Sequence, residues 1–370
     1  MSFRPLLNRA MAHISDTDDV TICIRHSKMN TSRKQYASLQ AGRGIAACLV
    51  ALMHAAGYID NDTRYWLHTG FAQPFLGGSL GVEYFFVLSG AVILLAHRRD
   101  IGRPETIASY LWKRFRRVYP IYWIILTIVV LEYMMRPSVG SAYQRNPWVI
   151  ISGYLLVHIH SMDANLPVAW TLFHEILFYL VFVACLFRRN LGIIVFSVWG
   201  LLSLAACFLR LPPYLHDYLI SPLHLLFIFG MLDTWLLLNR SVRHALSLGL
   251  AGVAVLTLTW VWVCVRSPLT TAQELLAGCG AALAVLGFAA LEKQDRLSVP
   301  RPLQLLGDAS YSIYLVHDPF LMALAPITYK VWTHARGPVV IPFLVMAALA
   351  IGVGWLVHLW IERPLLRWMA

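Results

Sequence analysis

The chain has 370 residues, of which 58% are hydrophobic and 13% are charged, and its mean hydropathy is +0.62. Soluble domains carry about 25% charged residues, so this composition excludes an ordinary soluble fold. The formal net charge is +11, but the basic residues cluster between apolar stretches, which argues against a nucleic-acid-binding protein.

Residues 1–36 are polar and basic and lack the apolar core and cleavage site of a secretory signal peptide, so we expect a flexible cytoplasmic tail. Residues 37–370 are expected to form one transmembrane domain, because apolar runs long enough to cross a bilayer recur along them. The predicted fold class is therefore all-α integral membrane, with about ten transmembrane helices. In chain order, they are predicted at residues 37–58, 77–96, 118–136, 168–187, 191–209, 220–238, 245–265, 270–291, 304–326 and 339–360.

The loops between these spans predict the topology. With the N-terminus inside, the inner loops beyond the tail hold 16 Lys and Arg residues against 7 in the outer loops, as the positive-inside rule requires. Both termini are then cytoplasmic. Residues 148–158 are apolar but too short to span, so we predict a re-entrant or interfacial segment on the outer face.

The first predicted helix carries two ionisable residues, Arg43 and His54. Such side chains are costly inside a membrane, so each is a candidate functional residue. Their separation is about three turns, which places both on one face about 16 Å apart. His54 falls in the outer half, where an imidazole could take a proton from a hydroxyl nucleophile. The alternative for His54 is a structural role as a hydrogen-bonded core histidine. The alternative for Arg43 is a side chain that extends to the lipid phosphates.

Three further ionisable groups fall at a similar depth: Glu83 in the second helix, Glu175 in the fourth and His317 in the ninth. A carboxylate there could orient an imidazole or bind sugar hydroxyls. The sequence predicts that these three residues and His54 converge on one catalytic centre. Either glutamate could instead make a structural polar contact between helices.

A run of basic residues, 113–117, precedes the third predicted span. Arg114, Arg116 and Arg117 in this run could bind the phosphates of a cytoplasmic acyl donor such as coenzyme A, because a guanidinium group offers two parallel hydrogen bonds. The simpler alternative is attraction to anionic lipid headgroups.

Four stretches form a recognisable series in chain order: residues 39–47 leading to His54, residues 81–90, residues 170–175, and residues 306–317 together with the closing Glu362-Arg363-Pro364. In these stretches and in their order, the chain resembles the acyltransferase-3 family of bacterial and eukaryotic membrane acyltransferases. Residues 40–42 and 173–174 depart from the usual sequence of that family.

The resemblance implies an O-acyltransferase that moves an acyl group, expected to be acetyl, from cytoplasmic acetyl-CoA to a carbohydrate hydroxyl. Arg43 and the basic run would bind the donor, and His54 would activate the acceptor. We favour direct transfer, because no serine or cysteine has a clear base partner in the sequence; an acyl-histidine intermediate is the alternative.

Three aromatic residues are further candidates under this hypothesis. Tyr311 and Tyr314, or a protonated His317, could donate to the oxyanion of the tetrahedral intermediate. Trp170 could stack on a sugar ring, although tryptophans are also expected near a membrane surface.

The expected partners are acyl-CoA, membrane lipids and a carbohydrate acceptor, either free or lipid-linked, such as an exopolysaccharide or an O-antigen. We expect no metal ion, and the expected location is the bacterial inner membrane. The sequence does not set the oligomeric state.

Two other classes of protein fit the ionisable residues. A secondary transporter of a small anion or sugar would also place such groups near the midplane, but it would be expected to have two related halves, and no such correspondence is found. A flippase or scaffold without chemistry is the third hypothesis, and unchanged function after His54→Ala would favour it.

Overall fold

The computed structural model describes residues 36–60, 70–136, 140–158, 164–266, 269–335 and 337–369, and every regular element within them is helical. Contacts between Cα atoms separate Met1–Tyr36 from Ala37–Ala370. Residues 1–35 of the predicted tail lie outside the described residues. The unit that begins at Ala37 holds every helix of the described ranges.

Nine helical segments in the described ranges are long and apolar enough to cross a bilayer, by length and composition. They match nine of the ten predicted spans, so the chain is an all-helical, multi-pass membrane protein. The remaining predicted span, the ninth in chain order at 304–326, falls on two helices, and the second of these is 26 residues long. His317 and Asp318 in its interior lower its hydropathy.

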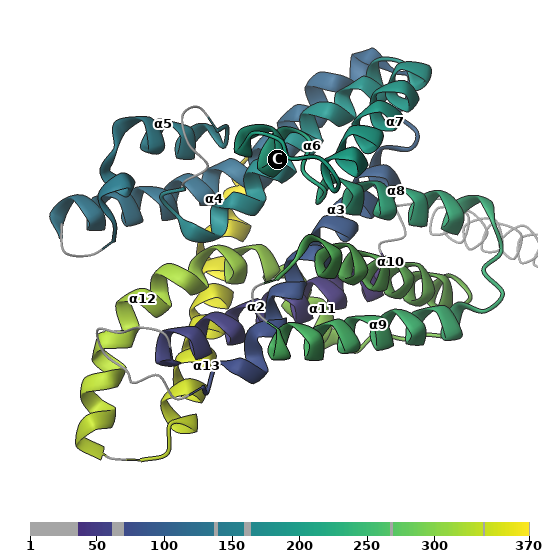
Figure 1. The fold of residues 1–370 in the computed structure, drawn as a ribbon. Helices are drawn as coiled ribbons and strands as arrows, with labels where there is room; N and C mark the ends of the chain where they lie inside the picture. Colours follow the sequence, from purple (N-terminus) through teal and green to yellow (C-terminus); the bar gives the residue numbers. More distant parts are fainter. Residues whose placement is uncertain are drawn as a thin grey trace, which may run out of the picture. The chain divides into compact units, whose positions relative to one another are not determined.

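The helices keep the labels of Figure 1. Their bounds are α2 Ala37–Asp60, α3 Gly81–His97, α4 Ile107–Met135, α5 Pro147–Leu155, α6 Trp170–Phe187, α7 Arg189–Ala206, α8 His224–Asn239, α9 Ala245–Val265, α10 Thr271–Lys293, α11 Arg301–Asp308, α12 Ser310–Ala335, α13 Val340–Val357 and α14 Arg363–Trp368, with short 3-10 or π turns η1 Gln73–Leu80, η2 Pro104–Thr106, η3 Ala142–Arg145, η4 Pro167–Ala169, η5 Leu215–Leu219 and η6 His358–Glu362.

Helix α2 packs against many neighbours: α3, α10, α11, α12 and α13 all contact it, and its ribbon lies among theirs in Figure 1. Small residues allow this, as is usual between membrane helices. A Cβ atom on Gly307 of α11 would lie 2.0 Å from the carbonyl oxygen of Gln40, and one on Gly44 would lie 2.8 Å from the nitrogen of Gly307. Both glycines are therefore needed where α2 and α11 touch.

Helix α4 begins at Ile107, eleven residues before the predicted span. The basic run 113–117 is consequently helical rather than part of a loop. Side chains three apart on a helix share a face, whereas adjacent ones do not. The start of α4 therefore decides which of the arginines face the protein interior.

Helix α5 confirms the prediction of a short segment that does not span. Its nine residues rise about 14 Å, less than half of a hydrocarbon core of about 30 Å. The last carbonyls of a helix lack partners within the helix, and lipid offers none. Side chains of α4 supply them: Tyr119 Oη donates to Leu155, Tyr122 Oη to Gly153 and Trp123 Nε1 to Tyr154, each at 2.9 Å.

Candidate active site

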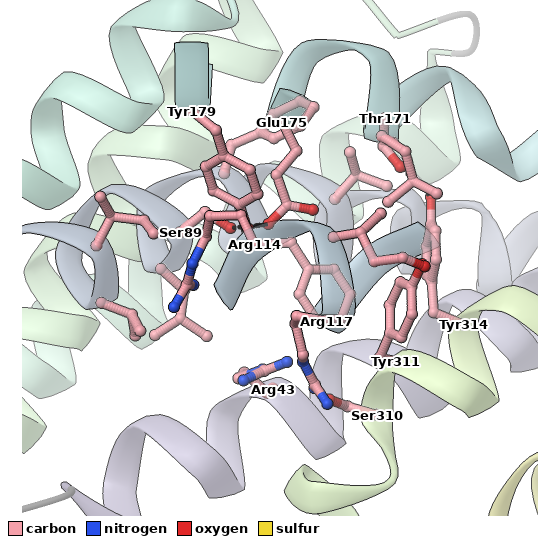
Figure 2. A pocket seen from close by; sticks show the side chains of 18 residues that line it. Arg43, Ser89, Arg114, Arg117, Thr171, Glu175, Tyr179, Ser310, Tyr311 and Tyr314 are labelled. Carbon is pink, nitrogen blue, oxygen red and sulfur yellow. Dashed lines mark hydrogen bonds between the residues drawn. The ribbon is translucent and has the colours of Figure 1, made fainter. Parts of the chain in front are cut away.

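A cavity of about 110 Å³ is lined by side chains from α2, α3, α4, α6 and α12. Three arginines and one glutamate are among its lining residues: Arg43, Arg114, Arg117 and Glu175. Figure 2 shows the guanidinium groups of the three arginines within this space. The excess of positive charge suits an anionic ligand, and guanidinium groups match phosphate geometry in particular.

The structure separates the three arginines of the basic run. Arg114 and Arg117 are three residues apart on α4 and line the cavity. Arg116 does not line it, and its Nη1 instead donates to the carbonyl of Met369 at 3.2 Å. Of the four predicted donor-binding arginines, the cavity therefore brings together Arg43, Arg114 and Arg117.

Glu175 forms part of the cavity wall rather than meeting His54. Its Oε1 accepts hydrogen bonds from Ser89 Oγ at 3.1 Å and from Tyr179 Oη. Tyr179 lies one helical turn further along α6, and Ser89 lies within the 81–90 stretch (Figure 2). These two hydroxyls fix the carboxylate beside the arginines.

Tyr311 and Tyr314 also line the cavity. Their hydroxyl groups are already engaged: Tyr311 donates to the carbonyl of Val118 at 2.9 Å, and Tyr314 lies 3.2 Å from the carbonyl of Val168 and 3.0 Å from Thr171 Oγ1. They anchor the wall and are not free to donate to an oxyanion in this state. Trp170 lies apart from the cavity lining, with its ring 5.8 Å from that of His174.

The predicted histidines His54 and His317 are in direct contact. His317 Nε2 lies 3.1 Å from His54 Nδ1, while His317 Nδ1 lies 3.1 Å from the carbonyl oxygen of Ile313 and His54 Nδ1 lies 3.1 Å from that of Val50. A carbonyl only accepts, so each Nδ1 carries the proton. His54 then donates to the lone pair of His317 Nε2, and the Nε2 of His54 keeps its own lone pair.

Tyr314 links the cavity to this pair, since it lines the cavity and its ring centroid lies 5.7 Å from that of His317. On α2, Arg43 lines the cavity and His54 lies three turns further along; on α12, Tyr311 lines the cavity and His317 contacts His54. The two helices contact each other. They therefore run side by side from the arginines to the histidines.

Two residues at the histidine pair were not predicted from the sequence. Asp318 is 5% exposed and within electrostatic range of His54, and it accepts a hydrogen bond from Tyr58 Oη at 3.2 Å. The available signals were local: Asp318 follows His317, and Tyr58 lies one turn beyond His54. Neither signal specified that the two would meet.

Glu83 is 3% exposed, and its Oε2 has no hydrogen-bond partner within the described ranges. No hydrogen bond or ion pair joins it to His54, His317 or Glu175 in those ranges. The four residues expected at one centre thus comprise a histidine pair, a cavity glutamate and a separate buried glutamate. The described part of the chain contains no group of three or more His, Cys, Asp or Glu that could hold a metal ion.

Comparison with known protein families shows which class this membrane protein belongs to. The model of the acyltransferase-3 family, described as an acyltransferase domain, matches residues 36–359. The chain belongs to this family and is an O-acyltransferase, which favours the enzyme over the transporter hypothesis.

Two curated relatives support the same class. The chain is 30% identical over 314 residues to the exopolysaccharide production protein ExoZ of Rhizobium meliloti, covering 78% of this chain and 90% of ExoZ. It is 24% identical over 333 residues to the peptidoglycan O-acetyltransferase OatA of Listeria monocytogenes, covering 80% of this chain but 51% of OatA. No solved structure matches the chain significantly.

Proposed function

We propose that this enzyme transfers an acetyl group from acetyl-CoA to a hydroxyl group of a cell-surface polysaccharide, with His54 as the general base. The observation that carries the proposal is the contact between His54 and His317 beside the arginine-lined cavity. One site can hold a polyanionic donor, and the other can remove a proton from an alcohol.

The hydrogen bonds of the pair favour this role for His54. His317 Nε2 and the carbonyl of Val50 both accept from His54 Nδ1–H, so the lone pair of His54 remains on Nε2. Within the described residues, Nε2 has no hydrogen-bond partner, and His54 is half-buried whereas His317 is fully buried. An acceptor hydroxyl could therefore approach His54 but not His317.

The chemical step follows from that tautomer. His54 Nε2 takes the proton of the acceptor hydroxyl while the hydroxyl oxygen attacks the carbonyl carbon of the thioester. The C–S bond then breaks, the thiolate of coenzyme A takes the proton from the imidazolium, and the products are an O-acetyl ester and free coenzyme A. The nearby carboxylate of Asp318 would stabilise the imidazolium while it exists.

Arg43, Arg114 and Arg117 are the proposed donor-binding residues. Coenzyme A carries several phosphates, and three guanidinium groups around one cavity offer paired hydrogen bonds to them. Tyr314 stands between this cavity and the histidines, so the thioester would have to pass it to reach His54. The predicted topology would put the donor at the cytoplasmic end of α2.

The names of the relatives support the acceptor class. One relative is named for exopolysaccharide production and the other for O-acetylation of peptidoglycan. Both names concern carbohydrate polymers. We therefore propose a polysaccharide hydroxyl as the acceptor, free or lipid-linked, and the bacterial inner membrane as the location.

The proposal is tested by acetyl transfer with purified protein in liposomes. Acetyl-CoA labelled in the acetyl group is supplied with polysaccharide from the host, and the label in polymer is measured before and after mild alkali, which cleaves esters and leaves amides. We expect alkali-labile label with the wild type. His54→Ala should lower the rate by about 10²- to 10⁴-fold.

His334→Ala is the matched control, because His334 is exposed on α12, the helix that also carries His317. It should label the polymer like the wild type. Equal labelling by His54→Ala would remove the base assignment. If neither the wild type nor any variant labels the polymer, whichever acyl-CoA is supplied, the proposed reaction is wrong.

A further inference from the structure

Glu362 is a buried carboxylate, 1% exposed, that accepts hydrogen bonds on both oxygens. Its Oε1 accepts from Arg117 Nη1. Its Oε2 accepts from Ser312 Oγ at 2.7 Å and from His358 Nδ1 at 2.8 Å. A buried charge is tolerated only when it is paired and hydrogen-bonded, and these three donors meet that requirement.

The backbone around Glu362 departs from a regular α-helix. Residues His358–Glu362 form the π turn η6, in which the N–H of Arg363 donates to the carbonyl of His358. Pro364 has no N–H, so it cannot donate to the carbonyl of Trp360, as the next residue of an α-helix would. His358 lies four residues before Glu362, a spacing that makes two side chains neighbours on a helix surface, and π turns such as η6 are frequent at functional sites.

The partner of Glu362, Arg117, is part of the cavity wall. Its guanidinium carbon lies 5.5 Å from the centroid of the Tyr311 ring, and its side chain is 28% exposed. The ion pair and the ring together restrain a long side chain that would otherwise be mobile. A guanidinium group has five N–H groups, and Arg117 donates one of them to Glu362, so others remain available to an anion in the cavity shown in Figure 2.

We infer that Glu362 is a positioning residue for the acyl donor: it fixes the guanidinium of Arg117 against Tyr311, and Ser312 and His358 fix Glu362 in turn. This inference rests on the proposed function, since it assumes that the cavity binds coenzyme A. A purely structural role for Glu362, tying the end of the chain to α4 and α12, would affect stability without selectively affecting the donor.

The test measures binding of coenzyme A to solubilised protein by calorimetry, together with KM and kcat for acetyl-CoA. Glu362→Gln keeps the shape of the side chain and removes its charge. We expect it to weaken coenzyme A binding and raise KM by about tenfold each, with kcat changed less than twofold, because a charge-assisted hydrogen bond to Arg117 is lost.

Glu292→Gln is the matched control. Glu292 also accepts two hydrogen bonds, from the backbone N–H groups of Ala37 and Ser38 at 2.7 and 2.8 Å, and it does not line the cavity. Its loss should lower the melting temperature while leaving coenzyme A binding and KM unchanged. A donor effect confined to Glu362→Gln would support positioning over a general loss of stability.

Ser312→Ala keeps the test valid if Glu362→Gln does not fold, since it removes one donor to Oε2 and leaves the pair with Arg117. It should weaken coenzyme A binding in the same direction by a smaller factor. Unchanged coenzyme A binding in the folded variants would overturn the inference, and tighter binding would too, because Glu362 would then act only by neutralising Arg117. If the wild type itself does not bind coenzyme A, the proposed function fails first.

Discussion

His317 Nε2 accepts the Nδ1 proton of His54 across 3.1 Å, so a fully buried imidazole orients a half-buried one. This arrangement assigns different tasks to two residues of the same type. His317 cannot reach a substrate without a rearrangement, whereas His54 presents a free lone pair. The division of roles leads to the first prediction.

His317→Leu should lower kcat by about tenfold or more with little change in KM for acetyl-CoA, because His54 loses an acceptor that orients its ring. His317→Gln should retain more activity, since its amide oxygen can accept the same proton. Steady-state kinetics of the two variants against wild type checks this. Equal losses in both would mean that His317 acts through its ring and not as an acceptor.

Asp318→Asn should lower kcat by about tenfold, equivalent to about 1.4 kcal/mol in the barrier. The amide keeps the hydrogen-bonding shape but cannot stabilise the imidazolium of His54 by charge. The measurement is kcat at saturating acetyl-CoA. Glu132→Gln serves as control, since Glu132 on α4 pairs at 3.7 Å with Arg136, the residue after that helix, and lies outside both sites. A similar loss there would contradict the specific role of Asp318.

Arg114→Lys should raise KM for acetyl-CoA by about tenfold, because lysine lacks the planar pair of donors that fits a phosphate. Arg116→Lys should leave KM unchanged, because Arg116 is directed to the carbonyl of Met369 and not to the cavity. Initial rates over a range of acetyl-CoA concentrations compare the two. If Arg116→Lys has the larger effect, the cavity is not the donor site.

Gly307→Ala should lower stability by about 1–3 kcal/mol, since its methyl group would meet the carbonyl oxygen of Gln40 at 2.0 Å. The melting temperature of solubilised protein reports the change. Gly57→Ala in α2 is the control, because nothing lies within 4 Å of a Cβ atom there. That variant should be neutral or slightly stabilising, and a loss as large as that of Gly307→Ala would contradict the packing argument.

Much of this architecture was predictable because membrane burial has simple rules. Nine of the ten spans follow from apolar length, and the short α5 is predictable from its length alone. The similar depth of His54 and His317 in the membrane favours a contact between them, because an ionisable group inside a membrane is costly and needs a partner. Where the termini lie relative to the membrane stays a prediction.

The side-chain contacts of the candidate site were not predictable, because they depend on distances between helices that the amino-acid sequence does not give. To predict that Arg114 and Arg117 face the cavity and Arg116 does not, one must know which face of α4 each residue occupies. That helix starts eleven residues before the predicted span, so the sequence pattern placed these arginines in a loop. The meeting of Tyr58 with Asp318 requires the register between α2 and α12, which neither helix specifies alone. Depth alone also grouped Glu83 and Glu175 with the histidines, although residues at one depth can face different neighbours.

The hydrogen bonds that α4 gives to the end of α5 also bear on how the chain can be made. Helix α4 precedes α5, so Tyr119, Tyr122 and Trp123 are already in place when the short helix is synthesised. Its terminal carbonyls then find donors on arrival, which lipid could not provide. A circularly permuted chain starting between the two helices would make α5 first, and the carbonyls of Tyr154 and Leu155 would lack their α4 donors until the very end of translation.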